Sequence, residues 1–180
     1  MINKIIKHLE DTLLHKQYVL ESAKKLCKYL IEVGRIDDAI ELVKRCSNHD
    51  NSKFEPDEIF ALIQISDKES LKDAKVQLDD AKKNALKIHW AKNSHHPEYY
   101  NDPSLMSDMD LLEMACDCNA RSMEFGTDLL EFIDIRQKER FRFPEEIYQT
   151  YYNYCKILVD SEEYDKDEPG KVFIKQEGES

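Results

Sequence analysis

Residues 48–53 read Asn-His-Asp-Asn-Ser-Lys, and the fold can be built outward from them in both directions. The segment before them, residues 36–47, has the pattern of a helix that runs directly into the His-Asp pair. Pro56, a few residues beyond them, suits the first turn of the next helix, because its missing N–H is not needed there. The segment therefore predicts a short connection that places an imidazole and a carboxylate together at a helix end.

The rest of the chain predicts further helices of the same kind. In the first of them, apolar residues recur at Ile5, Leu9 and Leu13 with helical spacing. Gly34 and Gly126 are expected to end helices, since glycine adopts the left-handed conformation needed there. Including those around the opening segment, helices are predicted over 2–33, 36–47, from 56, 71–92, 108–125, from 127 or 128, and 145–159. The sequence therefore predicts an all-α fold of about six or seven helices.

The chain has the length of a single compact domain. Its 180 residues can form one proper core but are too few to suggest two. Residues 1–159 are predicted to form the helical domain. Residues 160–180 hold eight acidic and three basic residues together with Pro169 and Gly170, and they are expected to form a loosely ordered acidic tail.

Charge and cysteine content exclude several classes of protein. The net charge of −11 argues against binding to long nucleic acid or to an anionic membrane. No apolar run approaches the roughly 20 residues that a membrane span requires. The five cysteines form no CxxC pair, and their odd number leaves at least one unpaired, so they are interpreted as free thiols in a reducing cytoplasm.

The histidines are the most informative residues for chemistry. Imidazole nitrogens and carboxylate oxygens suit divalent Mn, Fe, Co, Ni and Zn, whereas a structural zinc cluster usually requires thiolate spacing. His8 and His15 lie about 10.5 Å apart along one helix and cannot hold the same ion. His15 is the candidate because it shares a face with Val19 and Ala23, and His8 is expected to be solvated. Asp117 has small, largely apolar neighbours, which predicts a buried carboxylate that needs a partner or a metal.

The order of these residues resembles the HD superfamily of metal-dependent phosphohydrolases. In that superfamily a first His, a His-Asp doublet and a distant Asp hold one metal, and additional histidines hold a second metal in the dinuclear branches. The corresponding positions here are His15, His49, Asp50, His89, His95, His96 and Asp117. The resemblance therefore implies an HD-type helical domain with one or two divalent transition-metal ions.

A narrower resemblance covers roughly residues 8–125. The run from His89 to His95-His96-Pro97-Glu98-Tyr99-Tyr100, with Glu113-Met114 and Asp117 downstream, is similar to DUF5662, a small uncharacterised HD-like family of bacteria and phages. The chain departs from the cyclic-dinucleotide phosphodiesterase branch, because Glu98-Tyr99-Tyr100 replaces the Gly-Tyr-Pro signature. The resemblance implies no particular substrate.

Several residues are expected to act in such a site. Asp50 can bridge two ions, and Lys53, one turn beyond it, is expected to stabilise phosphate charge. Either His95 or His96 is expected to bind metal while the other contacts substrate, and the sequence leaves the assignment open. Glu113, one helical turn before Asp117, either orients a ligand histidine or forms an ordinary surface ion pair.

Other residues have two interpretations. Arg121 either contacts an anion or forms an ordinary surface ion pair with an acidic neighbour. Trp90 and Tyr99 either stack on a substrate ring or anchor the histidine loop to the core.

The sequence supports three functions. The first is hydrolysis of a phosphate ester or anhydride, with a small phosphorylated molecule such as a nucleotide as substrate and metal-activated water as nucleophile. The second is an HD-type mixed-valence di-iron oxygenase, because some relatives hold iron with a very similar set of residues. The third is a non-catalytic, metal-stabilised binding module. A homo-oligomer is compatible with all three.

Overall fold

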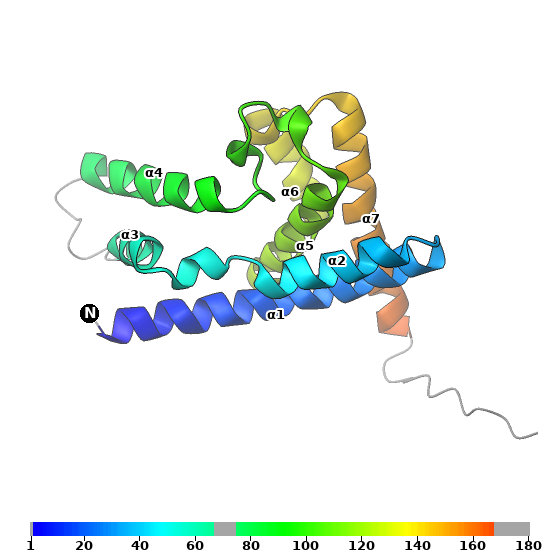
Figure 1. Cartoon of the computed structure of the whole chain (residues 1–180), viewed down its shortest axis with the longest axis horizontal. Helices are drawn as coiled ribbons and strands as arrows, with labels where there is room; N and C mark the ends of the chain where they lie inside the picture. The colour runs from blue at the N-terminus through cyan, green and yellow to red at the C-terminus, as the bar shows by residue number, and fades with distance from the viewer. Residues whose placement is uncertain (1, 67–74, 168–180) are drawn as a thin grey trace, which may run out of the picture.

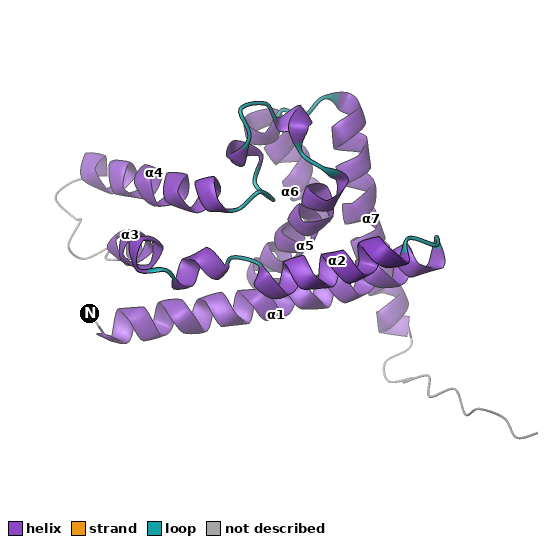
Figure 2. Cartoon of the chain, viewed as in Figure 1, coloured by secondary structure: helices purple, strands orange, loops and turns teal. Residues whose placement is uncertain are grey.

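The structure is a computed structural model, and it describes residues 2–66 and 75–167. Every regular element among these residues is helical, as Figure 2 shows. The seven α-helices of the described part are α1 Ile2–Glu32, α2 Ile36–Asn48, α3 Pro56–Ser66, α4 Lys75–Lys92, α5 Asp108–Phe125, α6 Leu129–Arg136 and α7 Glu145–Asp167. Three short 3-10 helices, η1 Asn51–Phe54, η2 Pro97–Tyr99 and η3 Pro103–Leu105, and a π-helical turn, η4 Gln137–Phe141, connect them. The predicted all-α fold is confirmed.

One helix boundary differs from the sequence prediction. The start predicted at residue 71 for the helix that contains α4 lies outside the described residues, which resume at Lys75. Helix α7 was expected to end near Val159 but continues to Asp167, into the segment assigned to the acidic tail. The remainder of that segment, residues 168–180, lies outside the described residues.

Local capping sets the ends of the helices around the site. Ser107 and Asp110 form a reciprocal capping box at the start of α5, and Gly126 ends this helix with φ +63°. The side chain of Asp128 accepts a hydrogen bond from the backbone N–H of Glu131 and so caps α6. Gly34, with φ +82°, allows the tight reversal between α1 and α2.

Helix α1 is the element on which the others are arranged. Figure 1 shows α2 running back along the C-terminal half of α1, while α3 and α4 lie toward its N-terminal half. Helices α5 and α7 pack against α1 from the other side. The site described below lies where the end of α2, the end of α4 and the middle of α5 approach α1.

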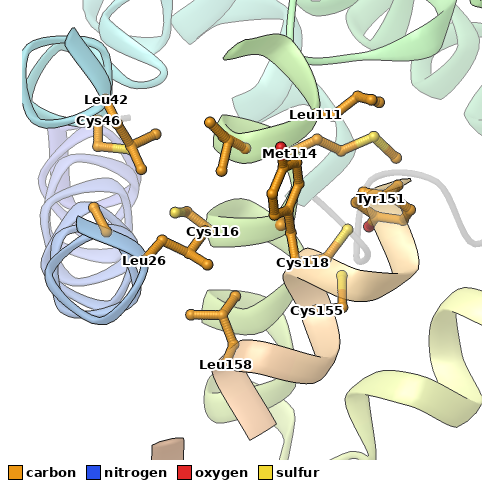
Figure 3. Close-up of a cluster of buried hydrophobic side chains, with 14 of the residues drawn as sticks. Leu26, Leu42, Cys46, Leu111, Met114, Cys116, Cys118, Tyr151, Cys155 and Leu158 are labelled. Atoms are coloured by element: carbon orange, nitrogen blue, oxygen red, sulfur yellow. The ribbon is translucent and has the colours of Figure 1, made fainter. Parts of the chain in front are cut away.

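The core lies between α1, α2, α5 and α7. Leu26, Leu42, Leu111 and Leu158, one from each helix, are almost completely buried, and Figure 3 shows them in one cluster. All five cysteines are buried and free, as the sequence predicted. The core is therefore rich in thiols that pack as small apolar groups. No helix in the described residues is long and apolar enough to cross a membrane.

Candidate metal centre

All seven residues expected to bind metal lie together in the structure. Their possible ligand atoms form three overlapping groups in which all atoms lie within 4.8 Å of one another. The groups are Asp50 with His89, His95 and His96; His15 with His49 and Asp50; and His49 with His95 and Asp117. These residues come from α1, α4, α5, the α2–η1 connection and the loop after α4, so only the tertiary fold brings them together.

Asp50 lies between two sets of imidazoles. Its Oδ1 is 3.4 Å from Nε2 of His89 and 3.6 Å from Nε2 of His95. Its Oδ2 is 3.5 Å from Nε2 of His49 and 4.0 Å from Nε2 of His15. The backbone of Asp50 has φ +55°, a left-handed conformation that is uncommon for residues other than glycine. This conformation allows one carboxylate to face both sets.

The remaining donors complete each set at short range. Asp117 Oδ1 is 3.0 Å from Nε2 of His15 and 3.7 Å from Nε2 of His49. The Nε2 atoms of His89 and His96 are 2.8 Å apart. Two ligand atoms that are each about 2.1 Å from one ion are separated by about 3.0–3.4 Å. The spacing within each set is therefore close to that of ligands that share an ion.

Three glutamates, of which Glu58 and Glu113 are buried, contact the outward-facing nitrogens of the histidines. In each pair a carboxylate oxygen accepts a hydrogen bond from Nδ1, which leaves the Nε2 lone pair facing the centre. The pairs are His15 with Glu124 (2.7 Å), His89 with Glu58 (2.6 Å), His49 with Glu113 (3.0 Å) and His95 with Glu113 (3.3 Å). The other oxygen of Glu113 accepts a hydrogen bond from Nε of Arg45 at 2.7 Å. Four histidines therefore have a fixed tautomer and ring orientation.

Several inward-facing atoms have no hydrogen-bond partner in the described part of the chain. They are Nε2 of His15, His49 and His95 and Oδ1 of Asp50, all fully buried. An unsatisfied buried polar atom costs about 1–3 kcal/mol. Four such atoms at one centre, all nitrogen or oxygen, fit borderline divalent metals and do not resemble a thiolate zinc site.

Neighbouring charges and burial shift several pKa values at the centre. The carboxylate of Asp50 raises the pKa of His49 to about 10, despite burial. Burial alone would raise the pKa of Asp50, but His49 and Lys53 beside it hold that pKa well below its usual range. The neighbouring His15 and His49 likewise hold the pKa of Asp117 well below its usual range, despite burial. Burial, together with the neighbouring His95, lowers the pKa of His96 far below its ordinary value. The two carboxylates are thus anionic and His96 is a neutral imidazole.

A cavity of about 520 Å³ opens onto the centre. Asp50, His89, His96 and Asp117 form part of its wall, so the candidate ligands are accessible from it. Its cationic lining residues are Lys53, Lys82, Arg121, Arg136 and Arg140. Its larger apolar lining residues are Leu62, Leu86, Trp90, Met114, Phe132 and Phe141. The cavity is therefore locally basic in a chain of net charge −11.

The structure places three of the four expected substrate contacts at this cavity. Lys53 lines it, with Nζ 2.5 Å from Oδ2 of Asp50, and Trp90 also lines it. Arg121 both lines it and pairs with Glu124 at 2.7 Å, so its two interpretations coexist. Tyr99 is 47 % exposed, packs against Tyr100 and does not line the cavity, so its placement does not support a substrate contact.

The expectation that His8 is solvated is wrong. Its Nε2 donates a hydrogen bond to the backbone carbonyl of Lys53 at 3.1 Å, and its side chain is half-buried. This contact ties the first part of α1 to η1 and thus to the segment that carries Lys53. His8 lies outside all three groups of potential metal ligands.

Sequence reasoning missed the residues that surround the ligands. Glu124 lies seven residues, or two helical turns, after Asp117, and this spacing would have placed both on one face. Glu58 resembled an ordinary acidic residue in the first turn of a helix. Arg140 lies in the π-helical turn after α6, and no sequence pattern indicated that it reaches the cavity.

Comparison with known proteins gives one match. Residues 4–160 match the model of a family of unknown function, DUF5662. The match covers the whole site and the helices that build it. No curated protein and no solved structure matches the chain.

Proposed function

This chain belongs to the DUF5662 family, and we propose that it is a metal-dependent phosphohydrolase of the HD type, acting on a small phosphorylated molecule such as a nucleotide. The observation that supports the proposal is the shared carboxylate of Asp50 between two sets of inward-facing imidazoles, at the wall of a basic cavity. The site itself would thus supply both the donors for two ions and the cations for an anionic substrate.

Each ion would have its own set of donors. The first set is His15, His49, Asp117 and Oδ2 of Asp50. The second is His89, His95, His96 and Oδ1 of Asp50, so that both residues of the His95-His96 pair serve as ligands. When bound, two divalent ions activate water near neutral pH and neutralise the charge of a phosphate.

The chain's own residues would bind and orient the phosphate. Lys53 contacts Asp50 and lines the cavity, so its ammonium group can meet phosphate oxygens beside the centre. Arg121 lies on the same wall and can contribute a second positive charge. Because the chain as a whole is strongly acidic, a cavity with five cationic side chains favours an anionic substrate specifically at this place.

An HD-type mixed-valence di-iron oxygenase is the second candidate. The donors consist of imidazoles and carboxylates without thiolate, a set that also suits iron. The basic lining of the cavity favours phosphate chemistry over this candidate, and the identity of the metal separates the two.

The test is metal analysis of the purified protein by inductively coupled plasma mass spectrometry. Wild type is compared with His49→Ala and Asp50→Ala, and His8→Ala is the matched control because His8 lies outside the cluster. We expect about two equivalents of transition metal in wild type and in His8→Ala. His49→Ala and Asp50→Ala should contain less metal than wild type. Circular dichroism checks that each variant is folded.

The metal found directs the next assay. With Mn, Co, Ni or Zn, release of phosphate from a panel of phosphorylated compounds, nucleotides included, is expected. Iron together with oxygen consumption would instead establish the oxygenase. Bound metal without turnover on any of these compounds would leave a metal-stabilised binding module, and failure to bind metal even after reconstitution would overturn all three functions.

A further inference from the structure

The cations of the cavity fall into two groups. Lys53 and Arg121 belong to the centre, because Lys53 contacts Asp50 and Arg121 pairs with Glu124, the partner of His15. Arg136 and Arg140 come from the end of α6 and the turn after it, and among the described residues neither forms a hydrogen bond or ion pair with a metal-ligand candidate. One phosphate at the centre would use the first group, and the second group would then contact no phosphate of the substrate.

Arg140 is held in a fixed orientation at the cavity wall. Its Nε and Nη2 donate to the two carboxylate oxygens of Glu98 at 2.5 and 2.9 Å. Its guanidinium lies 5.0 Å from the ring centroid of Trp90, also in the cavity wall. Among the described residues its Nη1 has no hydrogen-bond partner, which leaves one edge of the guanidinium for a ligand. Such preorganisation reduces the entropy lost when an anion binds.

Arg136 supports the same wall. Its guanidinium lies 5.2 Å from the ring centroid of Phe132, and in the described part its only ion pair is a 3.4 Å contact with Glu139. Both Arg136 and Phe132 line the cavity. Two guanidinium groups on aromatic rings thus form a wall with positive charge and flat apolar surface.

Glu98 connects this wall to the histidine loop. It follows His95, His96 and Pro97 directly in the sequence, and its carboxylate pairs with Arg140. The loop that carries the two histidines therefore also helps to position Arg140.

We propose that Arg136 and Arg140, on the aromatic wall of Trp90 and Phe132, bind a second phosphate group of the substrate while the first lies at the metal centre. The chain would then act on compounds with two or more phosphates on a flat ring system, such as nucleoside diphosphates or bisphosphates, in preference to monophosphates. This inference rests on the proposed function, because it assumes that the first phosphate lies at the centre.

The test measures equilibrium binding to the metal-loaded protein by calorimetry at low temperature. The probes are AMP, ADP and adenosine 3′,5′-bisphosphate, and the two diphosphorylated probes distinguish adjacent from separated phosphates. We expect wild type to bind at least one of them about tenfold or more tightly than AMP, as one charge-assisted contact provides. Arg136→Gln and Arg140→Gln should remove this preference and leave AMP binding nearly unchanged.

Two further variants sharpen the test. Arg142→Gln is the matched control, because Arg142 follows the same turn but does not line the cavity, and it should keep the preference. Glu98→Gln should weaken the preference only partly, since it loosens Arg140 without removing it. Equal affinity for AMP and both diphosphorylated probes in wild type, or an equal loss for all three probes in the arginine variants, would overturn the second subsite.

The test of the second phosphate subsite can fail or succeed independently of the test of the proposed hydrolase function. A preference that depends on Arg136 and Arg140, without phosphate release, would establish the subsite and overturn the hydrolase. Phosphate release from monophosphates and diphosphates alike, unaffected by either variant, would support the hydrolase and overturn the subsite.

Discussion

The carboxylate of Glu58 accepts a hydrogen bond from Nδ1 of His89 at 2.6 Å, and both side chains are buried. The bond holds His89 so that its Nε2 faces Asp50 and His96. A residue on α3 thereby positions a candidate ligand on α4.

Glu58→Gln is expected to weaken metal binding at the His89 side. The amide cannot act as a charged acceptor, so the ring loses part of its orientation and basicity, and the affinity for that ion should fall about 10–100-fold. Competition with a chromophoric chelator measures it. Glu55→Gln is the control, because the exposed side chain of Glu55, three residues earlier, pairs with Lys92 and not with a histidine. Equal affinities in wild type and Glu58→Gln would contradict the orienting role.

Metal stoichiometry should depend on which residue is removed. His15→Ala is expected to retain one equivalent, since it disrupts only the set with His49 and Asp117. His96→Ala should retain the other. Asp50→Ala should lose both ions, because its carboxylate faces both sets. Elemental analysis after dialysis gives the counts, and a loss of both ions in every variant would show that the two sets do not bind independently.

Lys53→Gln should separate turnover from metal binding. Loss of one preorganised cation near developing phosphate charge is expected to lower the turnover number about hundredfold. Metal content should stay at the wild-type level, since no donor is removed. Lys87→Gln, at an exposed position of α4, should leave both quantities unchanged. If Lys53→Gln loses metal instead, the lysine positions Asp50 and does not act on the substrate.

Asp110 should contribute stability that depends on pH. Burial raises the pKa of this carboxyl, but hydrogen bonds from Ser107, Tyr100, Arg45 and Ser94 outweigh that effect and lower its pKa to about 2. Because the folded-state pKa is below the unfolded one, the stabilisation is present above about pH 4 and is lost as the pH falls toward 2. It amounts to about 2 kcal/mol.

Urea unfolding of wild type and Asp110→Asn at several pH values tests this linkage. The difference in the free energy of unfolding should be largest at pH 5 and above and should shrink toward pH 2. A difference that stays constant across this range would show that the carboxylate charge is not what stabilises the fold.

Much of the site could be predicted from sequence because its donors are encoded by residue type. Imidazoles and carboxylates are conspicuous in a chain with six histidines, and the structure brings all seven candidate ligands together. The helices could be predicted for a similar reason. Periodicity, the Ser107 cap and the glycines at 34 and 126 act over one or two turns, where the chain's local preferences dominate.

The surroundings of the ligands could not be predicted in the same way. Glu58 and Arg140 have no local pattern that separates them from ordinary surface residues, and their partners lie 31 and 42 positions away. Tyr99 illustrates the converse, since it lies beside the histidine pair in the sequence but does not line the cavity.

The sequence by itself determined the helical class, the helix ends at Gly34 and Gly126, and the set of nitrogen and oxygen donors. Only the tertiary structure decided that Asp50 lies between two donor sets, that glutamates fix the histidine rings, and that arginines from the turn after α6 line the cavity. The physical reason is the distance along the chain over which each interaction acts. Helix formation depends on neighbours within about four residues, whereas burial and charge at this centre depend on side chains from five separate segments packed against one core.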